Sequence, residues 1–249
     1  MAVVKGSEPI KDAYRDEDRA ADYIKTRFDD PFGAEVHRRQ VARINREIRR
    51  VRPASLLEVA CGPARLTVEL EHVEKSVAVE QSPAMIAHAR KRLQEAGRTQ
   101  WTILQQDAFD LQLSDSFEMV VTFRFLRHFS VADRPRLFEQ IRRVLAPGGY
   151  LIFDVASVTA YKWLLNKWGV DGSWVDDYWF TREEFIREMR SERFVVEAMH
   201  PVHSLVHVQY YLFSRLQGRM PRAATSVSRG LTSLVAQDPY EWVAVCRSV

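Results

Sequence analysis

"LLEVACGPARLTVEL", residues 56–70, is the stretch that decides the fold of this chain. A short apolar run leads into a loop of small residues, and a helical spacing of apolar residues follows. The run is typical of a buried strand, and the later spacing predicts a helix over 64–73. A strand, a tight loop and a helix in this order form the first unit of many nucleotide-binding α/β domains.

The loop of this unit is poorly suited to a diphosphate. Dinucleotide-binding loops follow the pattern G-x-G-x-x-G, which lets the backbone approach a pyrophosphate closely. Here the three glycine positions hold Ala60, Gly62 and Arg65, and Pro63 removes one backbone donor. The small residues still allow a ligand to lie against the chain. The loop therefore predicts a nucleoside ligand without phosphates.

Strands and helices alternate after this first unit. A short apolar run at 55–60 predicts the first strand, and similar runs predict further strands at 75–80, 99–107, 117–123 and 150–155. Helical patterns are expected at 34–51, 82–97 and 131–149. Such alternation predicts a parallel sheet with helices on both faces, in which ligands bind beyond the carboxyl ends of the strands.

Local signals mark several of these boundaries. Ser82 is placed to cap the helix at 82–97, Pro83 suits its first position, and Gly97 suits its end. Downstream, Thr181 and Glu184 have capping-box spacing and predict a helix over 181–192. Strands are expected at 193–202 and 239–248, and the segment between them, 203–238, fits helix or strand equally well.

Three acidic residues stand at the ends of three successive predicted strands. Glu58 lies near the end of the first, Glu80 ends the second and Asp107 follows the third. A carboxylate at the second position can accept hydrogen bonds from both hydroxyls of a ribose. Asp107 could accept from an exocyclic amine, and Glu58 could attract an ammonium group. Together they predict a site for a cationic, donor-rich nucleoside rather than for NAD.

The segment 55–155 resembles the class I S-adenosylmethionine-dependent methyltransferases, and most closely the small-molecule enzymes of the quinone-biosynthesis type. The resemblance rests on "LLEVACGPARLT", "VAVEQSPAMIAHAR", "QQDAF" and "RRVLAPGGYLIF". It covers roughly 100 residues well and the remainder only in outline. Ala60 and Ala64 depart from the family pattern, which usually has glycines there.

The resemblance implies a Rossmann-like α/β fold, with a seven-stranded, mostly parallel sheet whose last strand is antiparallel. It divides the chain into an N-terminal helical arm or lid, 1–52, and a methyltransferase domain, 53–249, with acceptor elements at 156–180 and 203–238. An aromatic residue of the arm, Tyr14 or Tyr23, would cover the cofactor. The residues expected to bind S-adenosyl-L-methionine are Tyr23, Glu58, Ala60, Gly62, Glu80, Gln81, Asp107, Ala108 and Phe123.

The acceptor is expected beside the segment that follows the fourth predicted strand. Methyl transfer from a sulfonium needs alignment and exclusion of water, and a base only where the acceptor must lose a proton. His128 is the candidate base, although it could equally tie down its loop or touch the cofactor. Acceptor contacts are expected from Arg124, Arg127, Trp163, Tyr178, His203 and Tyr210. Each of these could also serve ordinary packing or surface charge.

Composition limits the other classes of function. The chain has 249 residues, 46% of them hydrophobic, and a net charge of only +3, so electrostatics does not demand a nucleic-acid partner. "HPVHSLVH" (200–207) matches no common zinc spacing, so no metal is expected. Two distant cysteines and a polar start favour the cytoplasm, and no apolar run reaches the ~20 residues of a membrane helix.

Two alternatives remain at this level. Residues 38–52 carry seven arginines, and the apolar residues among them have the spacing of an amphipathic helix. The basic face of this helix could dock RNA or protein for methylation. The altered loop also fits a cofactor-binding partner subunit without turnover. A homodimer stays open, as does the identity of the acceptor.

Overall fold

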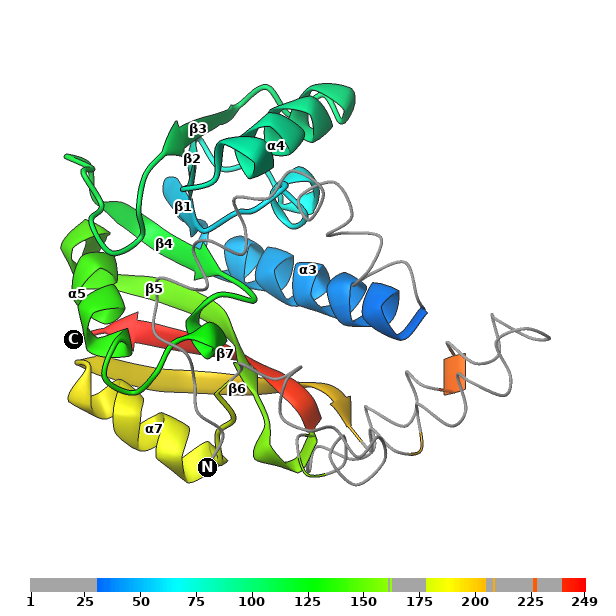
Figure 1. Cartoon of the computed structure of the whole chain (residues 1–249), viewed down its shortest axis with the longest axis vertical. Helices are drawn as coiled ribbons and strands as arrows, with labels where there is room; N and C mark the ends of the chain where they lie inside the picture. The colour runs from blue at the N-terminus through cyan, green and yellow to red at the C-terminus, as the bar shows by residue number, and fades with distance from the viewer. Residues whose placement is uncertain (1–30, 161, 163–177, 205–207, 209–225, 228–238) are drawn as a thin grey trace.

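The core of the protein is a single seven-stranded sheet (Figure 1). A computed structural model describes residues 31–160, 162, 178–204, 208, 226–227 and 239–249. The strands are β1 (Ser55–Val59), β2 (Lys75–Glu80), β3 (Trp101–Gln105), β4 (Phe117–Thr122), β5 (Leu145–Ala156), β6 (Phe194–Ser204) and β7 (Pro239–Ser248). They lie in the order β3-β2-β1-β4-β5-β7-β6.

The first five strands run parallel, and β7 lies antiparallel between β5 and β6. This confirms the predicted α/β class, the seven strands and the antiparallel last strand. The strand order reverses between β2-β1 and β4-β5. In open α/β sheets this reversal leaves a crevice beyond the carboxyl ends of β1 and β4, where ligands bind.

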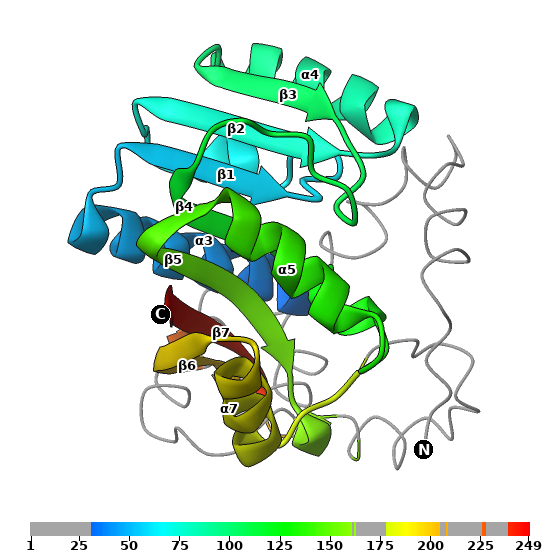
Figure 2. The same ribbon diagram turned by 90° about the vertical axis from the view of Figure 1, so that its left-hand side faces the viewer.

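Helices cover both faces of the sheet. One face carries α3 (Pro31–Val51) and α4 (Pro83–Glu95), and the other carries α5 (Arg134–Val144) and α7 (Arg182–Ser191), as Figure 2 shows. Successive side chains of β1 serve the two layers in turn: Leu56 packs with Ile44 of α3, and Leu57 packs in the layer of α5. Burial on both faces explains why β1 reads as an apolar run interrupted only by Glu58, rather than as an alternating pattern.

The predicted caps are present. The Ser82 side chain accepts a hydrogen bond from the Met85 N–H at 3.3 Å, Pro83 begins α4, and Gly97 has a φ of +65° just beyond the end of α4. Thr181 and Glu184 form the expected capping box of α7. Each device satisfies backbone groups that the helix end would leave without partners.

Two predicted helices are wrong in extent. In place of a helix over 64–73, the chain makes turns and a short 3₁₀ helix, η1 (Thr67–Glu69), which ends because Leu70 has an extended backbone, with φ −70° and ψ 144°. The helix expected over 131–149 is α5 alone, and Pro147 already lies in β5. A left-handed Gly148, with a φ of +70°, lies in the irregular start of that strand.

The predicted arm lies partly outside the described residues. Residues 1–30 are outside them, whereas the expected helix over 34–51 is present as α3. Val36, Val41, Ile44 and Ile48 of α3 are buried in the layer beneath it. Within the described residues no helix is long and apolar enough to span a bilayer.

A buried ion pair joins α5 to α7. Arg134 is 1% exposed, and its guanidinium donates to both carboxylate oxygens of Glu188 at 2.6 and 2.7 Å. The same side chain donates to the Phe129 carbonyl at 2.7 Å and lies 4.1 Å from the centroid of the Tyr178 ring. Removing one partner of such a pair leaves a buried charge uncompensated.

We expect Glu188→Gln to lower the free energy of unfolding by about 3 kcal/mol, because Arg134 stays buried without its counter-ion. Glu183→Gln on the exposed face of the same helix is the control and should change it by less than ~1 kcal/mol. Urea unfolding of both variants measures the difference. Equal stabilities would contradict this role for Glu188.

Candidate functional site

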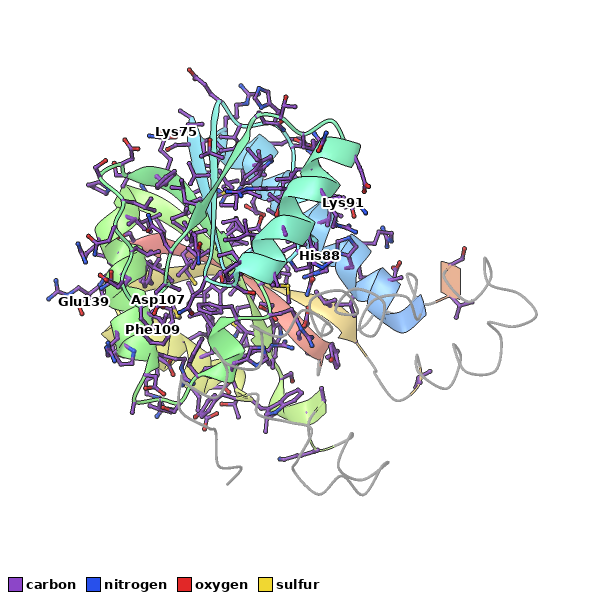
Figure 3. All side chains as sticks on the ribbon, turned by 45° about the horizontal axis from the view of Figure 1, so that its top comes forward. Lys75, His88, Lys91, Asp107, Phe109 and Glu139 are labelled. Atoms are coloured by element: carbon purple, nitrogen blue, oxygen red, sulfur yellow. The ribbon has the colours of Figure 1, made fainter. Side chains whose placement is uncertain are left out.

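A cavity lies beyond the carboxyl ends of β1, β2 and β4, at the point where the strand order reverses. Its walls come from the loop after β1, the end of β2, the loop after β3 and the segment after β4. Figure 3 shows Asp107 and Phe109 close together in the loop after β3, whereas Lys75 lies at the other end of the sheet, where β2 begins. The cavity thus occupies the edge of the sheet that the sequence predicted.

The three acidic residues share this cavity. Glu58, Glu80 and Asp107 all line it, so the expectation of one common acidic rim is confirmed. Parallel pairing explains why: β1 pairs with β2, and β2 with β3, which brings the three strand ends to one edge. What each carboxyl can do there depends on its own partners.

Glu80 holds the loops around it. Its carboxylate accepts three backbone hydrogen bonds, all at 2.9 Å, from the N–H groups of Gly62, Gln81 and Ser82. Burial raises the pKa of Glu80, and these three donors act against that rise. A carboxylate offers about four acceptor positions. Glu80 therefore keeps room for one further donor, and a second would have to replace a backbone N–H.

Glu58 lies deeper in the same site. It is 3% exposed, and the Thr67 hydroxyl donates to its carboxylate at 2.7 Å. Burial raises its pKa to about 7, helped by the charge of Glu80 and opposed by Thr67 and Arg65. Near neutral pH this side chain therefore stands between its neutral and charged forms.

The loop after β1 has the backbone of a glycine-rich loop with few glycines. Ala60, Gly62 and Ala64 have φ values of 55°, 55° and 59°, in the left-handed region that favours glycine. The Cys61 N–H donates to the Val79 carbonyl at 3.1 Å and ties the loop to β2. A Cβ built on Gly62 would meet no atom within 4 Å, so the backbone there is open to a ligand. Ala60 and Ala64 thus adopt a left-handed backbone at positions where the family pattern usually has glycine.

The loop after β3 forms the opposite wall. The Asp107 carboxylate accepts from the Phe109 N–H at 2.9 Å, and Ala108 beside it also lines the cavity. Phe109 lies edge-to-face on Phe129, with centroids 5.1 Å apart, and Phe125 packs on Phe129 at 4.9 Å. This wall combines one carboxylate with an aromatic cluster, which suits a flat, apolar ring.

The segment after β4 supplies several residues named from the sequence. Phe123, Arg124 and His128 line the cavity, and His128 ends the short 3₁₀ helix η2 (Leu126–His128). Gln81, at the end of β2, lines it as well. Their roles as cofactor contacts, acceptor contacts or base remain predictions.

Two predicted acceptor contacts have other surroundings. The Arg127 side chain is 1% exposed and pairs with Asp154 and Glu241, at 2.9 Å each. Tyr178 lies beneath the Arg134 guanidinium. Neither residue lines the cavity. The sequence could not distinguish Arg127 from Arg124, because a displacement of three residues in an irregular segment turns a side chain from the cavity into the core.

Several predictions lie outside the described residues. They concern Tyr14, Tyr23, Trp163, Tyr210 and the side chain of His203.

Other cavity residues were not predicted. Arg65 is 5% exposed and lines the cavity, although the sequence marked it only as a missing glycine. Met85 from α4 and the aromatic pair Phe125 and Phe129 also line it. The aromatic spacing in "TFRFLRHFS" was a usable signal for the pair. No local signal singled out Met85, because its position reads as ordinary helix core.

The arginines of α3 are largely engaged. Arg38 and Arg39 pair with Glu35, Arg50 pairs with Glu47, and Arg49 contacts the Glu71 carboxylate. These pairs offset the positive charge that suggested a docking surface for RNA. Among the described residues, no group of three or more potential ligands could hold a metal ion.

Comparison with protein families identifies the central part of the chain. The family described as "Methyltransferase domain" matches residues 56–149, which run from β1 into the start of β5. Residues 56–149 are a methyltransferase domain. The matched segment supplies every residue of the cavity.

Among curated proteins, the methyltransferase domain is similar to a carboxy-S-adenosyl-L-methionine synthase of Yersinia enterocolitica. The two are 35% identical over 81 residues, which is 32% of this chain and 30% of that protein. The chain thus aligns with about a third of the length of this relative.

Solved structures share the fold over a longer stretch. The magnesium protoporphyrin IX methyltransferase of Synechocystis, with bound SAH, has a TM-score of 0.68 at 13% identity, over 97% of this chain and 99% of that one. A cyclase has a TM-score of 0.64 at 16% identity, over 98% and 97%. The second likeness shows that this fold also serves a protein named for a different reaction.

The raised pKa of Glu58 predicts that the free energy of unfolding depends on pH. Its pKa rises from an ordinary 4.5 to about 7 on folding, so the folded protein holds this proton more tightly than the unfolded chain. The resulting stabilisation is full below the unfolded pKa and is lost as the pH rises through the folded one. We expect this group to remove about 3 kcal/mol of unfolding free energy between pH 4 and pH 8.

The variant Glu58→Gln should abolish that part of the decline, because its amide does not titrate. Urea unfolding at a series of pH values measures it as the difference between the two proteins. Parallel stability curves for wild type and variant would show that folding leaves the pKa of Glu58 unchanged.

Proposed function

We propose that the protein is an S-adenosylmethionine-dependent methyltransferase with a small-molecule acceptor. The observation that carries the proposal is the acidic rim of one cavity in a methyltransferase domain, beside a loop unsuited to phosphates. The lining holds three carboxyls against the two guanidiniums of Arg65 and Arg124, and this excess of acid favours a cation over a diphosphate. S-adenosylmethionine is a cationic nucleoside that carries no phosphate.

The residues present fit each part of such a ligand. Glu80 has one acceptor position left for a ribose hydroxyl. Asp107 and the apolar wall at Phe109 suit an adenine ring. Glu58 and Arg65, both buried in the cavity lining, would take an ammonium and a carboxylate respectively. This last pair distinguishes an amino-acid-bearing nucleoside from a plain one.

The sulfonium supplies an already activated methyl group when the cofactor is bound. The chain then has to bind, align and exclude water, which is where most of the rate enhancement of such a transfer arises. Phe123 and the Phe125–Phe129 pair provide an apolar surface beside the acidic rim. His128 lies on the same wall and could accept the proton of a hydroxyl acceptor.

A small acceptor is favoured by the cavity and by the chain's similarities. The magnesium protoporphyrin IX methyltransferase, named for a small molecule, shares the fold across nearly the whole chain. The paired arginines of α3 weaken the alternative of an RNA-docking helix. We retain the predicted lid over 1–52 and a homodimer as parts of this proposal.

Titration calorimetry with S-adenosylmethionine and S-adenosylhomocysteine tests the proposal directly. We expect heat of binding with both, and labelled methyl transfer from the first when a metabolite mixture is added. Binding without transfer would favour a non-catalytic partner subunit or another reaction on this fold. Absence of heat with either ligand would overturn the proposal.

Gly62 offers a specific test of the ligand's position. Gly62→Ala places a methyl group in open space, at a φ of +55°, so we expect a loss of stability of roughly 1 kcal/mol and a larger loss of cofactor affinity. Gly97→Ala is the matched control: its φ is +65°, its Cβ also meets nothing within 4 Å, and it lies away from the cavity lining.

Both variants should therefore lose similar stability in urea, while only Gly62→Ala loses affinity in calorimetry. Equal affinities for the two would place the ligand away from the loop after β1.

A further inference from the structure

A buried ionic cluster lies behind the segment after β4 that walls the cavity. It is separate from the acidic rim, because none of its residues lines the cavity. We define the cluster as Gln40, Arg127, Asp154 and Glu241. The three ionic side chains, those of Arg127, Asp154 and Glu241, are each at most 1% exposed. Charges are buried in this way only when they are paired, and the pairing must serve the fold or a site.

Four separate elements meet in this cluster. Asp154 lies in β5 and Glu241 in β7, whose antiparallel register puts Ala156 opposite Glu241. Arg127 enters from η2, between the two carboxylates, at 2.9 Å from each. Gln40 of α3 donates to the second oxygen of Glu241. The cluster thus ties the sheet and α3 to the segment that walls the cavity.

Asp154, unlike Glu241, accepts a hydrogen bond from the backbone of the wall. Its other oxygen, Oδ1, accepts a hydrogen bond from the backbone N–H of Arg124 at 2.6 Å. Arg124 has a φ of +58°, a left-handed backbone conformation that is unfavourable for residues other than glycine. A bond from a buried carboxylate to this one amide can hold the strained turn in place.

The conformation of this turn determines which side chains line the cavity. Arg124 lines it, as do its neighbours Phe123 and Phe125. At the other end of the segment, His128 lines it while the adjacent Arg127 is drawn into the cluster. One carboxylate, Asp154, therefore fixes the segment at two points, the Arg124 amide and the Arg127 guanidinium.

We infer that Asp154 is a positioning residue that holds residues 123–128 in the shape that forms the cavity wall. It lies behind the wall, outside the lining, and acts through Arg124 and Arg127. Glu241 also pairs with Arg127, but its other oxygen accepts from the side chain of Gln40 and not from the backbone of the wall. The effect on cofactor affinity rests on the proposed function, whereas the effect on the wall itself does not.

The test compares Asp154→Ala with Glu241→Ala. Both remove one carboxylate from Arg127, so both should lose stability, and only the first releases the Arg124 amide. Hydrogen exchange followed by mass spectrometry reports on the wall directly. We expect peptides covering 123–129 to exchange at least about tenfold faster in Asp154→Ala than in Glu241→Ala, after correction for global stability.

Affinity for S-adenosylhomocysteine, measured by calorimetry, is the second readout. We expect Asp154→Ala to weaken it about tenfold or more through loss of a preformed wall, and Glu241→Ala by less than ~threefold. Should either alanine variant fail to fold, Asp154→Leu and Glu241→Met, which keep a similar side-chain size without an acceptor, replace them, and the same order of effects is required. Equal effects of the two substitutions on exchange would overturn the inference. Failure of the wild type to bind would overturn the proposed function and leave the exchange test standing.

Discussion

The structure depends on carboxylates buried where parallel strands end. Glu80 gathers three backbone N–H groups from the loop after β1 and the start of α4, and so fixes two cavity walls at once. Such a group is costly to bury unless its acceptor positions are filled, which makes the surrounding loops conform to it. Burial raises the pKa values of Glu58 and Glu80. A cationic ligand would favour their charged forms, which links the fold to the proposed function.

Buried carboxylates also hold the segment after β4, where they pair with an arginine instead of with backbone groups alone. Asp154 and Glu241 are buried against Arg127, and Asp154 also carries the strained amide of Arg124. The acidic rim faces the ligand directly, whereas this cluster acts from behind the wall. Both arrangements use a carboxylate to hold irregular backbone that packing alone would leave loose. The cavity is therefore shaped by buried charge as much as by apolar contact.

The glycine-poor loop shows how conformation can persist when sequence changes. Ala60 and Ala64 keep the left-handed backbone that a glycine would adopt more easily, and Ala64 is fully buried. The bond from Gly62 to Glu80 and the tie from Cys61 to β2 hold that backbone in place. A comparison of letters alone would place this loop at the margin of the family. The family model nevertheless matches residues 56–149, which include this loop.

Sequence by itself determined most of the strand and helix order and the caps at Ser82 and Thr181, because periodicity and capping are local signals. It also determined that Glu58, Glu80 and Asp107 meet, because the carboxyl ends of neighbouring parallel strands lie at one edge of the sheet. It failed over 64–73, where an extended Leu70 ends a short 3₁₀ helix, and where Pro147 and Gly148 joined a strand. Only the tertiary structure decided that Arg124 faces the cavity while Arg127 turns inward to Asp154. The physical reason is that a buried charge finds its partners across the fold, and no spacing along the chain reports them.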